Sequence, residues 1–209
     1  MVTNLSASVV SILYNFQLMS IAGENGVAAY GVIMYVNIIF MAIFLGYSIG
    51  SAPIVSYHYG AENHTELKSM FRKSLILLTV SGVILVVLSE LVARPLVMIF
   101  TSYDPELLDM TASGFQLYAL AFLPMGFNVW GSAFFTALNN GAVSACISFL
   151  RTLVFQIIVV LTLPILLGID GIWLSIVAAE LLSLAVTVSF LLVKRKRYQY
   201  CLLYTSDAA

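Results

Sequence analysis

The chain has 209 residues, of which 61% are hydrophobic and only 9% are charged, and its formal net charge at neutral pH is −1. In soluble globular proteins about a quarter of all residues are charged, so this composition excludes a soluble domain. The alternating ten-residue segments of an outer-membrane barrel are absent as well. We therefore expect an all-α protein, a polytopic bundle of membrane helices.

Apolar stretches of the length needed to cross a bilayer follow one another along the chain. A hydrocarbon core about 30 Å thick takes roughly 20 residues of helix. We expect one lobe over residues 1–197 with six transmembrane helices, at about residues 3–22, 27–57, 69–92, 107–138, 142–167 and 171–193. Residues 198–209 are expected to be a disordered or artefactual tail.

Basic residues gather at one end of the predicted spans. Lys68, Arg72 and Lys73 follow the second span, the run 194–197 follows the sixth, and Arg151 lies in the first half of the fifth. Cytoplasmic loops retain Lys and Arg. This end is therefore predicted to face the cytoplasm, and an even number of spans places both termini there, in the cell membrane.

Two span boundaries carry helix-capping signals. Asp104, followed by a proline and a glutamate, predicts an N-cap at the start of the fourth span. Asn63 and Glu66 have the spacing of a capping box before the third span, and Gly60 is predicted to be the C-cap of the second.

The segment Gly46-Tyr-Ser-Ile-Gly50 has two readings. It matches the nucleophile elbow of serine hydrolases, but that elbow requires a strand, a turn and a helix. It also matches the GxxxG motif, which lets helices pack closely. We interpret Gly46 and Gly50 as packing residues. The sequence contains no HExxH motif, Walker loop or metal-spaced His/Cys cluster, so we expect no enzyme activity, cofactor or metal.

Polar side chains in the first, second and fourth spans recur at helical spacing. Such residues are costly in lipid, so they tend to face a cavity or another helix. In the second span they alternate with methionines, which adapt to irregular ligands, and with a tyrosine, whose face attracts cations. Packing and interhelical hydrogen bonds are the alternative interpretation. The candidate cavity residues are Asn15, Tyr30, Met34, Asn37, Met41, Tyr118, Met125 and Asn128.

The fourth span contains Pro124, which frees a backbone carbonyl and predicts a bend. Two charges lie deep in the last two spans, Arg151 and Glu180. Counted from the turn between these spans, their Cα atoms differ by about 12 Å in depth and by roughly 8 to 10 Å laterally. We expect no direct ion pair at a separation of about 15 Å. Glu180 is then a candidate for ion coupling, and a buried structural acid is the alternative.

The stretch from Gly46 to Asn63 ends the second span with Pro53, a Ser-Tyr pair and a Gly-Ala-x-Asn loop. It resembles the motif that closes the second helix of each lobe in the multidrug and toxic compound extrusion (MATE) family. Later features follow in the order of a carboxy-terminal MATE lobe. They are Arg94-Pro95, Asp104-Pro105-Glu106, Pro124, Arg151 and Gly168-Ile-Asp-Gly171.

This resemblance implies half of a secondary active antiporter, which exports amphipathic or cationic organic compounds by alternating access in exchange for H⁺ or Na⁺. It implies a central cavity lined by the first, second and fourth helices and a missing amino-terminal lobe as partner. Some relatives place coupling carboxylates in the first and fourth spans. Here those spans have amides and no acid in their interior, so coupling is expected either in the missing lobe or at Glu180.

Two alternatives remain. A flippase for lipid-linked saccharides has a similar fold, but several Arg or Lys residues in the cavity would favour it, and we expect none. A membrane scaffold subunit without transport activity is the other alternative. The expected partners are small molecules, the coupling ion, the lipid bilayer and the missing lobe, with no nucleic acid.

Overall fold

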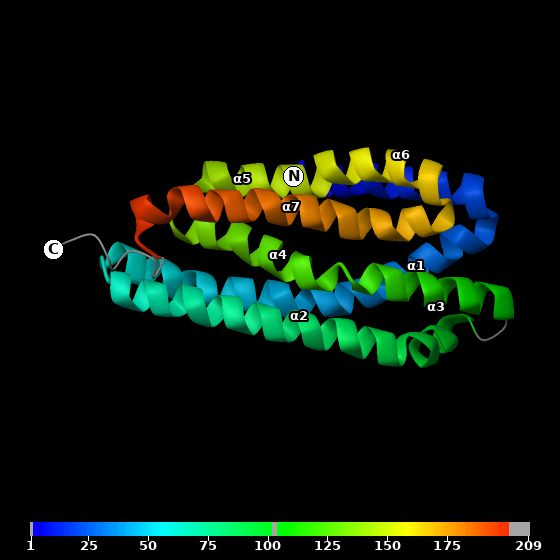
Figure 1. Cartoon of the computed structure of the whole chain (residues 1–209), viewed down its shortest axis with the longest axis horizontal. Coiled ribbons are helices and arrows are strands. Elements are labelled where there is room, and N and C mark those ends of the chain that lie inside the picture. Colours follow the sequence, from blue (N-terminus) through cyan, green and yellow to red (C-terminus); the bar gives the residue numbers. More distant parts are fainter. Residues whose placement is uncertain (1, 102–103, 201–209) are drawn as a thin grey trace.

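The computed structural model describes residues 2–101 and 104–200, with side chains from residue 6 onward. These residues form a helical bundle without strands, which confirms the predicted all-α class (Figure 1). The elements are α1 (Val2–Gly60), α2 (His64–Thr101), α3 (Pro105–Ala119), α4 (Phe122–Ala137), α5 (Gly141–Phe149), the π-helical turn η1 (Leu150–Val154), α6 (Phe155–Leu167) and α7 (Ile169–Tyr198).

Helix α1 consists of two arms that reverse direction at Gly23. The backbone there has φ 62° and ψ −150°, a conformation that is essentially restricted to glycine. In Figure 1 the dark-blue first arm and the lighter blue second arm run in opposite directions. The break falls between the first two predicted spans, 3–22 and 27–57.

A second interruption separates α3 from α4, whose axes differ by 50°. Pro124 is the third residue of α4 and lies in its first turn. Backbone N–H groups in the first turn have no partner within the helix, so a proline is tolerated there. The bend predicted near Pro124 is therefore confirmed. Helix α4 lies between α2 and α7 (Figure 1), and its Trp130, Phe134 and Phe135 are buried in the core.

By length and composition, four stretches of the described chain are able to cross a membrane, or five if α3 and α4 together form one bent span. The first of these stretches, 6–60, includes the reversal at Gly23. The structure thus has the elements of the expected six-span arrangement, although the count of six stays a prediction. Large apolar side chains on the outside, such as Ile99 and Leu166, suit contact with lipid.

The capping predictions are confirmed in part. The Asp104 Oδ1 atom accepts hydrogen bonds from the amides of Glu106 and Leu107 at 2.9 and 3.2 Å. Asn63 Oδ1 accepts from the amide of Glu66 at 3.1 Å. The C-cap prediction for Gly60 is wrong, because Gly60 is the last residue of α1 and the left-handed residue of the turn is Glu62, with φ 54°.

Close packing at Gly46 and Gly50 is not found in this lobe. Both are exposed, and a Cβ atom added to either would have no neighbour within 4 Å. Close approach occurs instead at Gly171, where a Cβ atom would lie 2.5 Å from the carbonyl oxygen of Leu163. Pro53, between Gly50 and Gly60, is exposed within α1.

The assignment of residues 198–200 to a tail is wrong. Tyr198 ends α7, is buried, and its hydroxyl accepts a hydrogen bond from Asn140 Nδ2 at 3.0 Å. The buried ring of Tyr200 packs against Phe71 and Phe134, with centroids 4.9 and 5.1 Å apart. Residues 198–200 are therefore part of the packed lobe, and 201–209 lie outside the described residues.

Candidate ligand cavity

A cavity of about 360 Å³ opens between α1, α3, α4, η1, α6 and α7. Its volume lies in the range of small-molecule sites. Six of the eight predicted cavity residues line it, and so does Glu180. They are Tyr30, Met34, Asn37, Met41, Tyr118 and Met125.

The two other predicted residues do not line the cavity. Asn15 in α1 donates a hydrogen bond to the backbone oxygen of Ser11 at 2.8 Å. Asn128 in α4 is completely buried behind the cavity wall. Asn37 does line the cavity, and its buried Oδ1 atom has no hydrogen-bond partner among the described residues.

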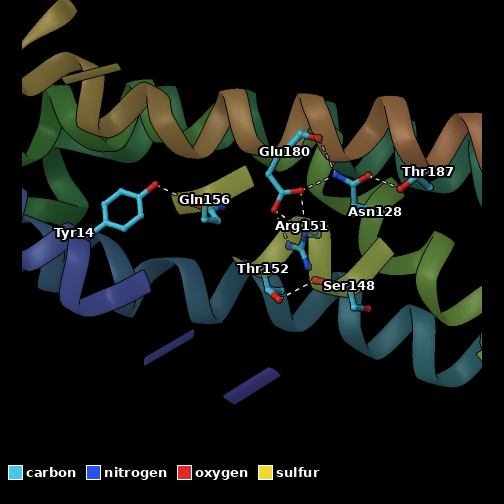
Figure 2. A network of polar contacts seen from close by, with 8 residues as sticks. All are labelled: Tyr14, Asn128, Ser148, Arg151, Thr152, Gln156, Glu180 and Thr187. Carbon is cyan, nitrogen blue, oxygen red and sulfur yellow. Dashed lines mark hydrogen bonds and ion pairs between the residues drawn. The ribbon is translucent and has the colours of Figure 1, made fainter. Parts of the chain in front are cut away.

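One side of the cavity is aromatic. The rings of Tyr14 and Tyr30 stack with centroids 5.3 Å apart and an interplanar angle of 4°. Tyr14 is held in place because its hydroxyl donates to Gln156 Oε1 at 2.9 Å, as Figure 2 shows. Together with Met34 and Met41, these rings offer a polarisable apolar surface that can accept a flat or cationic organic group.

The opposite side carries an ion pair between Arg151 of η1 and Glu180 of α7. Arg151 Nε donates to Oε1 and Oε2 of Glu180 at 2.8 and 3.0 Å, and Nη2 lies 2.8 Å from Oε1. The side chains of Arg151 and Glu180 are only 14% and 3% exposed. The expectation that these residues form no ion pair is wrong.

The fifth span is not a regular α-helix at Arg151. The estimate assumed regular α-helix throughout the fifth span, whereas η1 places Arg151 in a wider turn, in which the amide of Phe155 bonds to the carbonyl of Leu150. Such a turn changes both the axial rise and the direction in which a side chain points. The two long side chains cover the remaining distance (Figure 2).

Asn128 and Thr187 extend the ion pair into the bundle. Asn128 Nδ2 donates to Oε2 and to the backbone oxygen of Glu180 at 2.7 and 2.9 Å, and its Oδ1 accepts from the Thr187 hydroxyl at 3.0 Å. Both carboxylate oxygens of Glu180 therefore have charged or amide donors. This arrangement is that of a structural ion pair with its hydrogen-bonding capacity filled.

The fifth span contributes a wall that the sequence analysis missed. Arg151, Thr152 and Gln156 line the cavity, although no Arg or Lys was expected there. Gln156, an amide in an otherwise apolar helix, was the available signal. Arg151 supplies one neutralised guanidinium, which falls short of the several basic groups expected for pyrophosphate lipids. The described residues contain no cluster of three or more potential metal ligands.

Comparisons with known proteins agree with this architecture. The model of the MatE family matches residues 1–162. No curated protein gives a significant match. Among solved structures, an outward-facing multidrug resistance MATE family transporter of the MOP superfamily is 21% identical, with a TM-score of 0.83 over 95% of this chain and 44% of its own.

Two further structures are similar to this chain. The MATE transporter VcmN of Vibrio cholerae in its bent form is 18% identical, with a TM-score of 0.86 over 96% of this chain and 46% of its own. A MOP superfamily transporter from Pyrococcus furiosus, described by the reverse polarity of its binding pocket, is 21% identical, with a TM-score of 0.84 over 95% and 44%. The chain thus spans less than half the length of these structures, and the likeness establishes the fold.

Proposed function

This chain belongs to the MatE family of membrane transporters, and on that basis we propose that it is the carboxy-terminal half of a multidrug efflux antiporter. The half would work with an amino-terminal lobe in the cell membrane, with both termini cytoplasmic. It would export amphipathic or cationic organic compounds by alternating access, in exchange for H⁺ or Na⁺.

The cavity is the observation that carries this proposal. Its stacked tyrosines and its methionines suit the apolar body of an organic compound, and Asn37 adds an amide side chain to the lining. Three methionines in the lining, two on α1 and one on α4, allow ligands of different shape to be accommodated. This combination supports a broad range of substrates.

The charge pattern argues against ion coupling within this half. Glu180 is the acidic residue on the cavity wall, and its carboxylate is paired with Arg151 and Asn128. A cation or proton would have to displace a guanidinium to bind there. We therefore propose that the coupling carboxylate lies in the amino-terminal lobe and that Glu180 shapes the cavity.

A cavity-filling variant tests the site. Met41→Trp in the full-length transporter should reduce export of a fluorescent amphipathic cation from cells, since the larger ring occupies binding volume. Met98→Trp is the matched control, because Met98 is 46% exposed on α2 and does not line the cavity. Export should depend on the ion gradient and cease with an ionophore.

If Met41→Trp exports several compounds as well as the unchanged protein does, at equal membrane expression, the helix face of Met41 serves packing and does not bind substrate. If none of the tested compounds is exported but lipid-linked saccharides are moved across the membrane, the flippase is favoured. A protein that moves neither class would favour the scaffold subunit.

Orientation has its own test. Cysteines placed in the first turn of α7 and in the turn that follows α1, Asp170→Cys and Asn63→Cys, lie at opposite ends of the bundle (Figure 1). An impermeant thiol reagent added to intact cells should label the first and not the second. The reverse labelling would overturn the proposed topology.

A further inference from the structure

A second cavity, of about 370 Å³, lies between α2, α4 and α7 and shares no lining residue with the ligand cavity. Its α7 wall is a single helix face at spacings of three and four residues. This wall consists of Leu184, Thr187, Val188, Leu191, Leu192 and Arg195. Val188 and Leu192 are 42% and 53% exposed, so the cavity is an open groove that faces the surroundings of the protein.

Two hydroxyl side chains line the groove, and both hydroxyls donate hydrogen bonds to the protein itself. The Thr187 hydroxyl donates to Asn128 inside the bundle. The Tyr200 hydroxyl donates to the backbone oxygen of Leu191 at 2.7 Å, so its ring covers the end of the groove beside Phe71. An occupant of this part must be apolar, and in a membrane the surrounding apolar molecules are acyl chains.

One end of the groove is cationic. Arg195 lines it and belongs to the basic run 194–197, whereas Arg72 and Lys73 of α2, which follow Phe71 in the sequence, line a different hollow. None of these basic side chains is in an ion pair, because the two ion pairs of the described residues are Arg94–Asp109 and Arg151–Glu180. The acidic residues near this end of α2, Glu62 and Glu66, do not line the groove.

The length of the groove matches one leaflet. From Leu184 to Arg195 there are 11 residue steps, or about 16 Å at 1.5 Å per residue. Half of a hydrocarbon core about 30 Å thick is about 15 Å. An acyl chain that fills the apolar part would therefore place its headgroup at the depth of Arg195.

We propose that this groove binds one anionic phospholipid of the surrounding bilayer, with an acyl chain between α2 and α7 and the phosphate at Arg195. Arg195 is suited to this role because a guanidinium forms paired hydrogen bonds with phosphate oxygens. The site is independent of the transport proposal, since it requires only that the chain lies in a membrane.

Native mass spectrometry of the purified protein in detergent tests the site. Dioleoylphosphatidylglycerol and dioleoylphosphatidylcholine, which share their acyl chains, are titrated separately. The anionic lipid should bind more tightly. Arg195→Gln should weaken its binding about fivefold, the effect of one basic group near a lipid surface, and Lys196→Gln, an exposed neighbour outside the groove, should weaken it less.

The apolar part has a matched pair of variants as well. Val188→Trp fills the groove and should weaken binding of the phosphatidylglycerol, whereas Val193→Trp, at a position 72% exposed and outside the groove, should not. Equal effects of Arg195→Gln and Lys196→Gln together with no effect of Val188→Trp would overturn the proposal in favour of diffuse charge attraction. Lipid binding that appears only after deletion of residues 201–209 would overturn it in favour of the tail as occupant.

Discussion

Arg151→Met should destabilise this lobe severely, because the change leaves the Glu180 carboxylate buried with the Asn128 amide as its remaining side-chain donor. Charge centres about 4 Å apart interact by roughly 4 kcal/mol at an effective dielectric constant of 20. Removing one partner of a buried pair costs about 3–5 kcal/mol. For a chain of this size that loss corresponds to a fall in Tm of about 6–20 °C.

Thermal unfolding of the purified protein in detergent, followed by tryptophan fluorescence, measures this loss. Glu180→Gln should cost less, because Arg151 is 14% exposed toward the cavity and can be hydrated there. The double variant should recover part of the loss caused by Arg151→Met. Arg94→Met is the control: its pair with Asp109 spans 3.0 Å but is 67% and 65% exposed, so it should cost no more than about 1 kcal/mol. A shift for Arg151→Met as small as that of Arg94→Met would refute the reasoning.

Gly171→Ala should destabilise the lobe by about 1–3 kcal/mol, because the added Cβ atom meets the backbone oxygen of Leu163, which cannot move aside easily. Gly46→Ala should instead stabilise it by about 0.5–1 kcal/mol, since the new methyl group has no neighbour within 4 Å and alanine favours the helix; a loss of stability would show that this face is covered. Asp104→Ala should cost about 1 kcal/mol through loss of the α3 N-cap, measurable as a lower Tm, and an unchanged Tm would contradict the capping role.

The sequence predicted those features that depend on local chemistry. The apolar runs indicated membrane helices, the Asp104 cap marked the start of α3, and Pro124 indicated the bend. Helical spacing was enough to bring Tyr30, Met34, Asn37 and Met41 to one cavity wall, because they share one face of one helix arm.

Features that depend on contacts between distant segments were missed. The ion pair between Arg151 and Glu180 joins residues 29 positions apart, and neither the π-helical turn at Arg151 nor the reach of the two side chains has a local sequence signal. Tyr200 was assigned to a tail because its partner, Phe71, lies 129 positions earlier in the chain. The exposure of Gly50 similarly depends on which helix lies opposite, which a motif does not specify.

The network around Glu180 also has a mechanical consequence. Asn128, Arg151 and Thr187 connect α4, η1 and α7 through buried, charge-assisted hydrogen bonds, and breaking them would expose a carboxylate to apolar surroundings. These three elements should therefore move as one rigid body. Bending within this lobe is then expected at the 50° interruption between α3 and α4 or at Gly23, where the backbone hydrogen-bond ladder is already broken.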